Sequence, residues 1–562
     1  MKKTTIIIIS LAGALLFCLG LLLGIWLGTA SDKEATPRVK ARVQYYKDGL
    51  LWEKDEAPDF TDADVKELVY EGETMTYISH SQGFSLALPP DSRPDFLLAE
   101  QLVRFTSQSA EIIISRELVP DGYEAESYIG EYIHRYLLEP SYLEANRITL
   151  HKDAMEQIRD TRVQVVALKR VPAPGSTVIQ NAYVYCYIYS DKEPKVFYRI
   201  LFKAEEYNDA LIEQIYKTLY SFSEQVEKKG VSKNAVDFYP VLPENWSEET
   251  RALYDDIVSS SKIKWGAFVT GGVREQNREA VEKLEKLIDY KLQVLLEYGC
   301  HFDPFPMEGM QTAYEQGKIV EFTMHVSSVM NENLGGFNPA LEVLDGVHDE
   351  TLRAFARDAK TFGKPFLFRL NNEMNSDWVS YGATAALNDP DIFVNLWRHI
   401  YKIFEEEGVN NAIWIFNPNN NSFPPQAYNH MLAYYPGNEY VHMFGITGYN
   451  TGTYYKVENN EKWHEFEELY DKIHWASHGY FKNFPWIITE FASSSIGGNK
   501  PRWITNMFNT ITKYENIKIA VWFNADDIDP RPEKRKAVAR PYRLDETPQT
   551  IKAFREGIAA FK

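Results

Sequence analysis

Two short apolar stretches decide the fold: PFLFRL at residues 365–370 and WIITE at residues 486–490. Runs of this length are typical of buried strands and short for helices. The chain around them alternates similar runs with longer amphipathic stretches. This alternation predicts parallel strands connected by helices.

Eight runs of this kind follow one another in the second half of the chain. They are residues 264–269, 293–298, 319–325, 365–370, 412–416, 443–449, 486–490 and 518–523. Eight strands with helical intervals are typical of a (β/α)8 TIM barrel, and a doubly wound open sheet is the alternative. Because no glycine-rich dinucleotide fingerprint follows the first run, we predict an α/β protein with a (β/α)8 barrel over residues 240–562.

The part before the barrel has a different pattern of apolar and polar residues. Residues 76–223 mix alternating strand-like runs with two helical patterns and close on a helix, which predicts an α+β sandwich. This part resembles small PsbP-like exported domains in its pattern of elements. It contains no group of residues that predicts catalysis, so we expect a spacer or a binding module. Residues 224–239 are charged and polar and predict a linker.

The N-terminus predicts export. Two lysines precede an apolar run from Ile6 to Gly28, which at about 1.5 Å per residue spans a bilayer core of about 30 Å. The apolar part of a cleaved signal is shorter, about 7 to 15 residues, so residues 1–30 favour an uncleaved transmembrane anchor, with cleavage as the alternative. Residues 31–75 predict a tether, and the bulk of the chain then faces outward at the cell membrane, or is secreted if cleavage occurs.

The composition excludes some partners. The chain has 60 basic and 79 acidic residues, a formal charge of −19, which argues against nucleic acid and against an anionic glycan. Aromatic residues make up 14%, more than a core alone requires. We expect no metal and no organic cofactor, since no zinc-like spacing and no phosphate-binding loop occurs. The composition leaves the oligomeric state open.

The active site of such a barrel lies at the C-terminal ends of its strands. Two of these ends carry a glutamate, because Glu373 follows the fourth run and Glu490 closes the seventh. Retaining glycoside hydrolysis uses such a pair about 5 to 5.5 Å apart, one as proton donor with a raised pKa and one as nucleophile. Aromatic side chains on which sugar rings can stack occur at or near the same strand ends: Trp378, Trp414, Tyr449 and Trp522.

Several segments resemble those of one enzyme family. RLNNEMNSDW at 369–378 resembles the acid/base segment of family 26 glycoside hydrolases, the β-mannanase family, and IITEFA at 487–492 resembles its nucleophile segment. Further segments are similar in sequence and order: WGAF at 265–268, GKP at 363–365, YPGNEYV at 435–441, GITGYN at 445–450 and VWFN at 521–524. The resemblance covers about residues 240–560.

This resemblance implies roles for the matching residues. Glu373 would be the general acid/base and Glu490 the nucleophile. Tyr449 would hydrogen-bond Glu490 and keep it ionised, and Arg369 would support both glutamates from the barrel interior.

The resemblance also implies contacts with the sugar. Trp522 would form the floor of the subsite for the distorted sugar, Trp378 would line the neighbouring subsites, and Asn417 would contact a sugar hydroxyl. Mannanases of the family usually carry histidine directly before the acid/base, where this chain has Asn372, the residue type that the wider clan uses for the sugar 2-hydroxyl. That hydroxyl is axial in mannose and equatorial in glucose and xylose, so the departure leaves the sugar open. His325, at the end of the third run, is a candidate for the missing imidazole function.

Together these observations predict a membrane-anchored, outward-facing, retaining β-glycoside hydrolase. Its substrate would be a β-linked polysaccharide, mannan-like or another β-glycan. One alternative is a catalytically idle barrel that binds cell-surface polysaccharide. Another is a structural component of an envelope complex, acting mainly through residues 76–223. The linkage and the endo or exo mode do not follow from the sequence.

Overall fold

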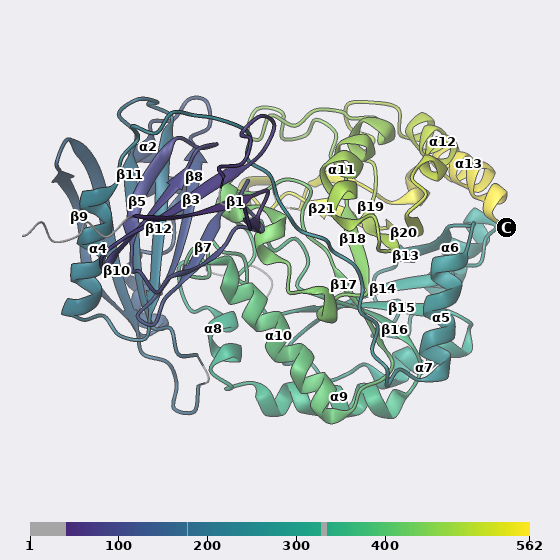
Figure 1. The fold of residues 1–562 in the computed structure, drawn as a ribbon. Helices are drawn as coiled ribbons and strands as arrows, with labels where there is room; N and C mark the ends of the chain where they lie inside the picture. Colours follow the sequence, from purple (N-terminus) through teal and green to yellow (C-terminus); the bar gives the residue numbers. More distant parts are fainter. Residues whose placement is uncertain (1–40, 55, 177, 328–333, 535) are drawn as a thin grey trace, which may run out of the picture.

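The structure is a computed structural model that describes residues 41–54, 56–176, 178–327, 334–534 and 536–562. The anchor predicted at residues 1–30 lies outside these ranges. Among the helices that the structure describes, none combines the length and the apolar character needed to cross a membrane. The described chain forms a sheet domain followed by a barrel (Figure 1).

Eight parallel strands close into a barrel in sequence order. They are β13 (Lys264–Phe268), β14 (Val294–Cys300), β15 (Ile319–His325), β16 (Phe366–Leu370), β17 (Ala412–Phe416), β18 (Met443–Thr447), β19 (Trp486–Phe491) and β20 (Ile517–Phe523). The ring closes where β13 pairs with β20, with Lys264 opposite Ile519. The eight predicted runs are these eight strands, so the predicted barrel is confirmed.

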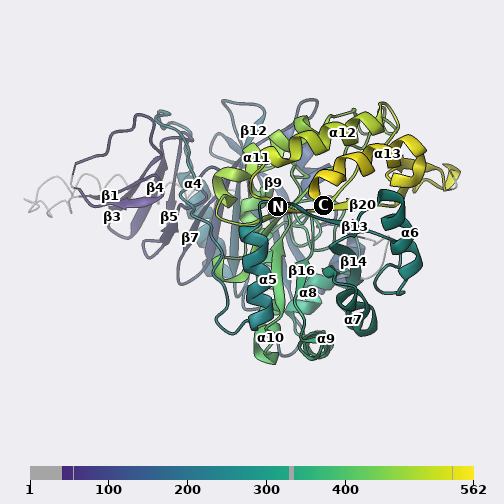
Figure 2. The ribbon, with the colours of Figure 1, turned by 90° about the vertical axis from the view of Figure 1, so that its right-hand side faces the viewer.

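Helices surround the barrel (Figure 2). They are α5 (Glu248–Ser259), α6 (Arg278–Ile288), α7 (Met307–Glu315), α8 (Pro339–Leu344), α9 (Asp349–Phe362), α10 (Pro390–Glu407), α11 (Phe466–Phe481), α12 (Lys500–Thr510) and α13 (Pro548–Ile558). Helix α5 begins at the Ser247 cap, whose side chain accepts from the Thr250 amide. Its Tyr254 and Ile257 pack against the apolar side chains inside the barrel, so α5 closes the end of the barrel that precedes the strands.

Short elements complete this half of the chain. The 3₁₀ turns are η2 (Ala427–Asn429), η3 (Met431–Tyr434), η4 (Asn438–Tyr440), η5 (Ile511–Lys513), η6 (Pro532–Lys534), η7 (Leu544–Glu546) and η8 (Ala559–Phe561), and β21 (Asp526–Ile528) pairs with β22 (Val538–Pro541). Residues 417–442, all of them described, connect β17 to β18 through η2, η3 and η4 without an α-helix.

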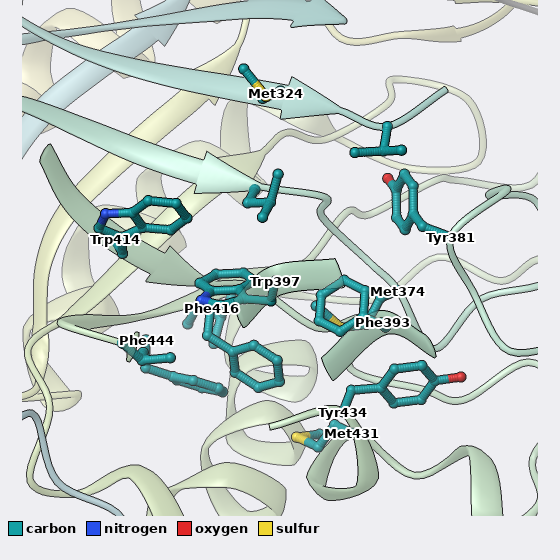
Figure 3. Close-up of a cluster of buried hydrophobic side chains, with 14 of the residues drawn as sticks. Met324, Met374, Tyr381, Phe393, Trp397, Trp414, Phe416, Met431, Tyr434 and Phe444 are labelled. Carbon is teal, nitrogen blue, oxygen red and sulfur yellow. The ribbon is translucent and has the colours of Figure 1, made fainter. Parts of the chain in front are cut away.

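Side chains of the barrel strands alternate between its interior and the surrounding helices. Leu367 and Ile413 face the interior, whereas Trp414 faces outward and packs against Trp397 of α10 at 5.6 Å between ring centroids. Figure 3 shows this outer layer, in which Trp414 and Phe416 lie beside Trp397. The alternation therefore decides which residues can reach the mouth of the barrel.

The N-terminal domain consists of two antiparallel sheets. The first orders its strands β2-β1-β3-β4-β5 and the second β6-β7-β8-β12-β11-β10-β9. Their bounds are β1 (Arg42–Lys47), β2 (Leu50–Trp52), β3 (Val65–Glu71), β4 (Thr74–Ser79), β5 (Phe84–Leu88), β6 (Arg93–Asp95), β7 (Val103–Thr106), β8 (Glu111–Leu118), β9 (Ile148–Ile158), β10 (Thr161–Arg170), β11 (Ala182–Tyr189) and β12 (Val196–Ala204). Four helices accompany them: α2 (Ala125–Tyr128), the π-helical η1 (Ile129–Ile133), α3 (Pro140–Ala145) and α4 (Asp209–Ser221). Both sheets and α4 share one apolar core.

The tether predicted at residues 31–75 is wrong from residue 42 onward, because β1, β2 and β3 lie within it. The sequence there is polar for two reasons. The side chains of β1 are exposed or half-buried, and the buried Lys66 of β3 is neutralised by Asp64, whose Oδ1 lies 2.6 Å from its Nζ. A buried ion pair and a strand without fully buried side chains both hide the apolar alternation by which strands are recognised.

The seven-stranded sheet packs its second face against the barrel. Apolar side chains of this face and of the barrel's outer layer form one continuous core. Ion pairs lie at its margin, where Arg104 donates to Asp391 at the start of α10 with distances of 2.5 and 2.6 Å. Arg170 donates to Asp345 at 2.6 and 3.0 Å. The two domains are therefore joined by an extensive buried interface.

Candidate active site

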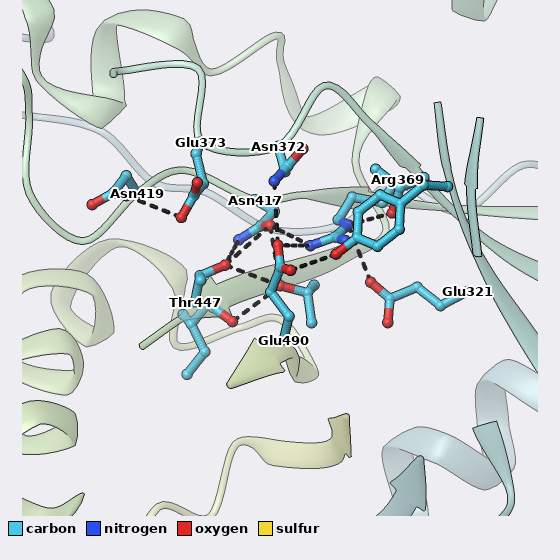
Figure 4. Close-up of polar contacts among 12 residues, drawn as sticks. Glu321, Arg369, Asn372, Glu373, Asn417, Asn419, Thr447 and Glu490 are labelled. Carbon is cyan, nitrogen blue, oxygen red and sulfur yellow. Dashed lines mark hydrogen bonds and ion pairs between the residues drawn. The ribbon is translucent and has the colours of Figure 1, made fainter. Parts of the chain in front are cut away.

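Glu373 and Glu490 lie in one polar cluster at the C-terminal end of the barrel (Figure 4). Glu373 follows β16 by three residues, and Glu490 belongs to β19. The backbone of Glu373 is left-handed, with φ 56°, a conformation that costs a non-glycine residue on the order of 1 kcal/mol or more. Its amide donates to the Asn417 carbonyl at 2.7 Å, and this contact holds the strained segment in place.

Four donors surround the Glu490 carboxylate, which is 6% exposed. Its Oε1 accepts from Arg369 Nη1 at 3.0 Å and from Asn372 Nδ2 at 3.2 Å. Its Oε2 accepts from the Tyr449 hydroxyl at 3.1 Å and from the Tyr298 hydroxyl. Hydrogen bonds of this kind stabilise negative charge on a carboxylate, so the surroundings of Glu490 suit a nucleophile.

Glu373 has different surroundings. It is partly exposed at the barrel mouth, and its carboxylate accepts from Asn419 Nδ2 at 3.0 Å. Burial of the carboxyl and the charge of Glu490 raise its pKa to about 7, while Arg369 and hydrogen bonds from Trp378 and Asn419 oppose the rise. A carboxyl with this pKa can both donate and accept a proton near neutral pH.

A buried arginine supports the cluster from below. Arg369 is fully buried and donates through Nε to Thr323 at 2.7 Å and through Nη1 to Asn417 Oδ1 at 3.0 Å. Its Nε also lies 3.2 Å from Glu321 Oε1. Burial raises the pKa of Glu321 to about 8, although Arg369 opposes the rise. At neutral pH Glu321 is therefore largely protonated, and the positive charge of Arg369 is directed to Glu490.

Only some of the residues expected to contact a sugar lie at the mouth of the barrel. Asn372 Oδ1 lies 2.7 Å from His325 Nε2, so these two predicted residues are neighbours beside Glu490. Trp378 is half-exposed and lies 5.3 Å from the exposed ring of Phe423. These two rings offer an aromatic surface on the Glu373 side of the mouth.

Three predictions for the mouth are wrong. Trp522 is fully buried, donates to the Tyr542 carbonyl at 3.1 Å and packs among outward-facing rings. Trp414 is 3% exposed in the same outer layer. Asn417 points inward but is fully buried beneath the glutamates, where Arg369 and Thr489 use its Oδ1. All three residues lie at or near strand ends. Trp522 and Trp414 are kept from the mouth because their side chains point outward from the barrel, and Asn417 because it lies too deep inside.

Three site residues were missed. Tyr298, in β14, donates to Glu490, and Phe523 follows Trp522 and stacks on Phe268 at 4.9 Å. Asn419 reaches Glu373 from the connection after β17. Inward alternation along β14 and β20 identifies the first two, and a run of asparagines at residues 419–421 marks the third.

Parts of the chain are similar to known proteins. Residues 310–480 match the profile described as glycosyl hydrolase family 26. Endoglucanase H of Acetivibrio thermocellus is 34% identical over 307 residues, which cover 54% of this chain and 31% of that protein. "Mannan endo-1,4-beta-mannosidase A and B" of Caldalkalibacillus mannanilyticus is 32% identical over 250 residues, which cover 39% of this chain and 45% of that protein. The chain thus spans less than half the length of either relative.

Among solved structures, the catalytic domain of a GH26 endo-β-1,4-mannanase of Bacillus sp. JAMB-750 is similar, with a TM-score of 0.42 and 19% identity over 57% of this chain and 92% of that one. GH26C of Muricauda sp. MAR_2010_75 is also similar, with a TM-score of 0.42 and 16% identity over 56% and 90% of the two chains. The profile match over residues 310–480 and the two curated relatives thus show that the barrel is similar to glycosyl hydrolase family 26.

Proposed function

We propose that this protein hydrolyses a β-linked polysaccharide with retention of configuration, with Glu490 as nucleophile and Glu373 as general acid/base. The observation that carries the proposal is the contrast between the two carboxylates. Glu490 receives four hydrogen bonds that stabilise its charge, whereas the pKa of Glu373 is raised to about 7. Environments that separate the roles of two carboxyls in this way are those that retaining hydrolysis requires.

The reaction then proceeds in two steps. Glu490 attacks the anomeric carbon while Glu373 gives its proton to the departing glycosidic oxygen, which leaves a glycosyl-enzyme ester. The ionised Glu373 next takes a proton from water, whose oxygen attacks the same carbon and releases Glu490. Arg369 stays bound to Glu490 from below and helps the carboxylate leave at the end.

The sugar is the finer part of the proposal. Relatives are named both endoglucanase and mannan endo-1,4-β-mannosidase. Asn372 contacts Glu490 directly, and His325 lies behind it at 2.7 Å from its side-chain oxygen. We propose that Asn372 meets the sugar 2-hydroxyl and that a mannan-like β-glycan is the substrate. Activity on mannan, mixed-linkage glucan and β-1,3-xylan, with product stereochemistry followed by NMR, distinguishes the sugars and tests retention.

The first test of the whole proposal is Glu490→Ala, measured on an activated aryl glycoside. We expect turnover to disappear, because no other group can form the ester. Glu439 is exposed and belongs to the 3₁₀ turn η4, before β18, so Glu439→Ala is the matched control and should keep full activity. Full activity of the Glu490→Ala protein refutes the assignment. Sugar binding without hydrolysis by the wild type favours the idle polysaccharide-binding barrel instead.

Location is a separate proposal that rests on the sequence alone. We propose that the apolar run from Ile6 to Gly28 anchors the chain in the cell membrane with the barrel outside, where a polysaccharide is accessible. Fractionation of cells and protease treatment of intact cells test this proposal. A barrel in the membrane fraction that external protease degrades supports it, and a barrel protected until lysis contradicts it.

A further inference from the structure

A buried carboxylate of the sheet domain holds the connection that follows β17. Glu117 of β8 is fully buried, and its Oε2 accepts from the Ala427 amide at 2.6 Å and its Oε1 from the Tyr428 amide at 3.1 Å. Next to it, the Leu118 carbonyl accepts from Gln426 Nε2 at 3.0 Å. A charge without such partners would be costly to bury, so this contact is specific to the turn at residues 426–428.

A buried cation of the same sheet holds the same turn and a second loop. The guanidinium of Arg199, in β12, lies 4.3 Å from the centre of the Tyr428 ring, and the residue is 1% exposed. Its Nη2 donates to the Asn388 carbonyl at 2.6 Å. Asn388 lies near the end of the loop at residues 371–389, which carries Glu373 after β16. The sheet domain therefore contacts both loops that border Glu373, the one after β16 and the one after β17.

Hydrogen bonds continue from this turn to Glu373. Asn429 Nδ2 donates to the Asn375 carbonyl at 3.0 Å, and Asn375 Oδ1 accepts from the Asn419 amide at 2.7 Å. Asn419 Nδ2 then donates to Glu373 at 3.0 Å. Asn375 and Asn429 are 0% and 1% exposed, so solvent does not compete for these contacts. Three residues, Asn429, Asn375 and Asn419, thus connect the turn that Glu117 holds to Glu373.

The connection has little scaffold of its own. Residues 417–442, all described, contain 3₁₀ turns and no α-helix, whereas α10 precedes β17 and α11 precedes β19. A strand of the other domain, β8, contacts η2 instead. The position of Asn419 thus depends on residues outside the barrel.

We propose that Glu117 and Arg199 are positioning residues of the active site, which act through Asn419 to hold Glu373 in the geometry of proton donation. This inference rests on the proposed function and gives the sheet domain a role in it. The domain is then a structural part of the catalytic site, in place of the spacer or binding module expected from the sequence.

The test compares two substrates of the same sugar in the full-length chain. Glu117→Gln puts an amide NH₂ against a backbone N–H and disturbs the turn. A polysaccharide needs a proton on its leaving oxygen, whereas a 2,4-dinitrophenyl glycoside does not. We expect kcat/KM on the polysaccharide to fall about 10-fold or more, since general acid catalysis contributes about 10² to 10⁴-fold. We expect kcat/KM on the dinitrophenyl glycoside to change less than about 3-fold, as a fraction of that effect. Arg199→Lys, which keeps the charge and loses the planar contact, should show the same split.

The matched control is Glu193→Gln in the same domain. Glu193 is paired with Arg116 and Lys228 at the surface, so both substrates should be hydrolysed at the wild-type rate. An equal loss on both substrates in Glu117→Gln, in step with its loss of thermal stability, would mean a merely structural contact and overturns the inference.

Hydrogen exchange gives a readout that needs no activity. In Glu117→Gln the amide of Asn419 should exchange faster, while amides of β20 keep the wild-type rate. Unchanged exchange at Asn419 also overturns the inference. A wild type that hydrolyses neither substrate refutes the proposed function instead, and hydrogen exchange then still decides whether Glu117 holds Asn419.

Discussion

At the scale of single residues, the site separates two glutamates by what surrounds them. Glu490 is enclosed by donors from β14, β16 and the segments after β16 and β18. Glu373 is partly exposed and accepts from Asn419 at 3.0 Å and from Trp378. The separation depends on Arg369, which cannot lose its proton in the range where the glutamates titrate. A third carboxyl, Glu321, shares that arginine and stays largely protonated.

Glu321 leads to a prediction about stability. Because its pKa is about 8 in the folded chain and about 4.5 when unfolded, the folded state binds the proton more tightly. Stability is therefore lost as pH rises from about 4.5 to about 8. In Glu321→Gln this loss is absent, so its free energy of unfolding relative to wild type should rise between pH 5 and pH 8.5, by at most on the order of 4 kcal/mol.

Urea unfolding at both pH values measures this difference. Glu439→Gln, at an exposed glutamate, serves as the control and should show no pH-dependent difference from wild type. If the gap between Glu321→Gln and wild type is the same at pH 5 and pH 8.5, the carboxyl of Glu321 is already ionised in the folded chain.

At the scale of elements, the sequence predicts strands far better than it predicts which way their side chains point. All eight barrel strands, and the glutamates after the fourth and in the seventh, follow from apolar runs and the resemblance of the adjoining segments. Trp522 was placed in the mouth because it resembles a family position, yet Val521 before it faces the interior. Its neighbours alternate, so Trp522 faces the helices and Phe523 takes the inward position. Asn419 escaped prediction because its place is set by contacts between loops.

The two tryptophans assigned to the sugar should therefore behave differently. Trp522→Phe should lower the free energy of unfolding by about 1 to 3 kcal/mol, through lost packing and the lost bond to Tyr542, and leave kcat/KM unchanged. Trp378→Phe, at a half-exposed ring, should leave stability nearly unchanged and raise KM. Thermal unfolding and steady-state kinetics on the polysaccharide measure both. A raised KM with full stability in Trp522→Phe would return Trp522 to the site.

At the scale of the whole molecule, the sheet domain and the barrel form one unit. The predicted domain order follows from changes in the pattern of apolar and polar residues along the chain, but no local pattern predicts the interface between the domains. Its apolar residues look like ordinary core, and its charges, such as Arg104 and Asp391, look like ordinary surface. Contacts between residues almost 300 positions apart leave no periodic trace in a single sequence.

This unity predicts how a fragment behaves. Residues 240–562 expressed alone should aggregate or unfold at a lower temperature than the intact chain, because the outer face of the barrel that the sheet covers becomes exposed. The intact chain should unfold in a single transition. Scanning calorimetry and size-exclusion chromatography of both proteins measure this. A fragment as soluble and as stable as the intact chain would contradict it.

Helix α5 also constrains the movement of protons. Tyr254 and Ile257 belong to the same apolar cluster as Leu367, Ile413 and Ile487 of the barrel interior, and Glu321 pairs in register with Leu367 beside this cluster. Within the part of the chain that the structure describes, this cluster fills the α5 end of the barrel with apolar side chains. We therefore expect protons to reach Glu321 from the mouth, past Glu490 and Glu373. A polysaccharide bound at the mouth would block this route. Glu321 would then keep, for as long as the substrate is bound, the protonation state that it had when the substrate arrived.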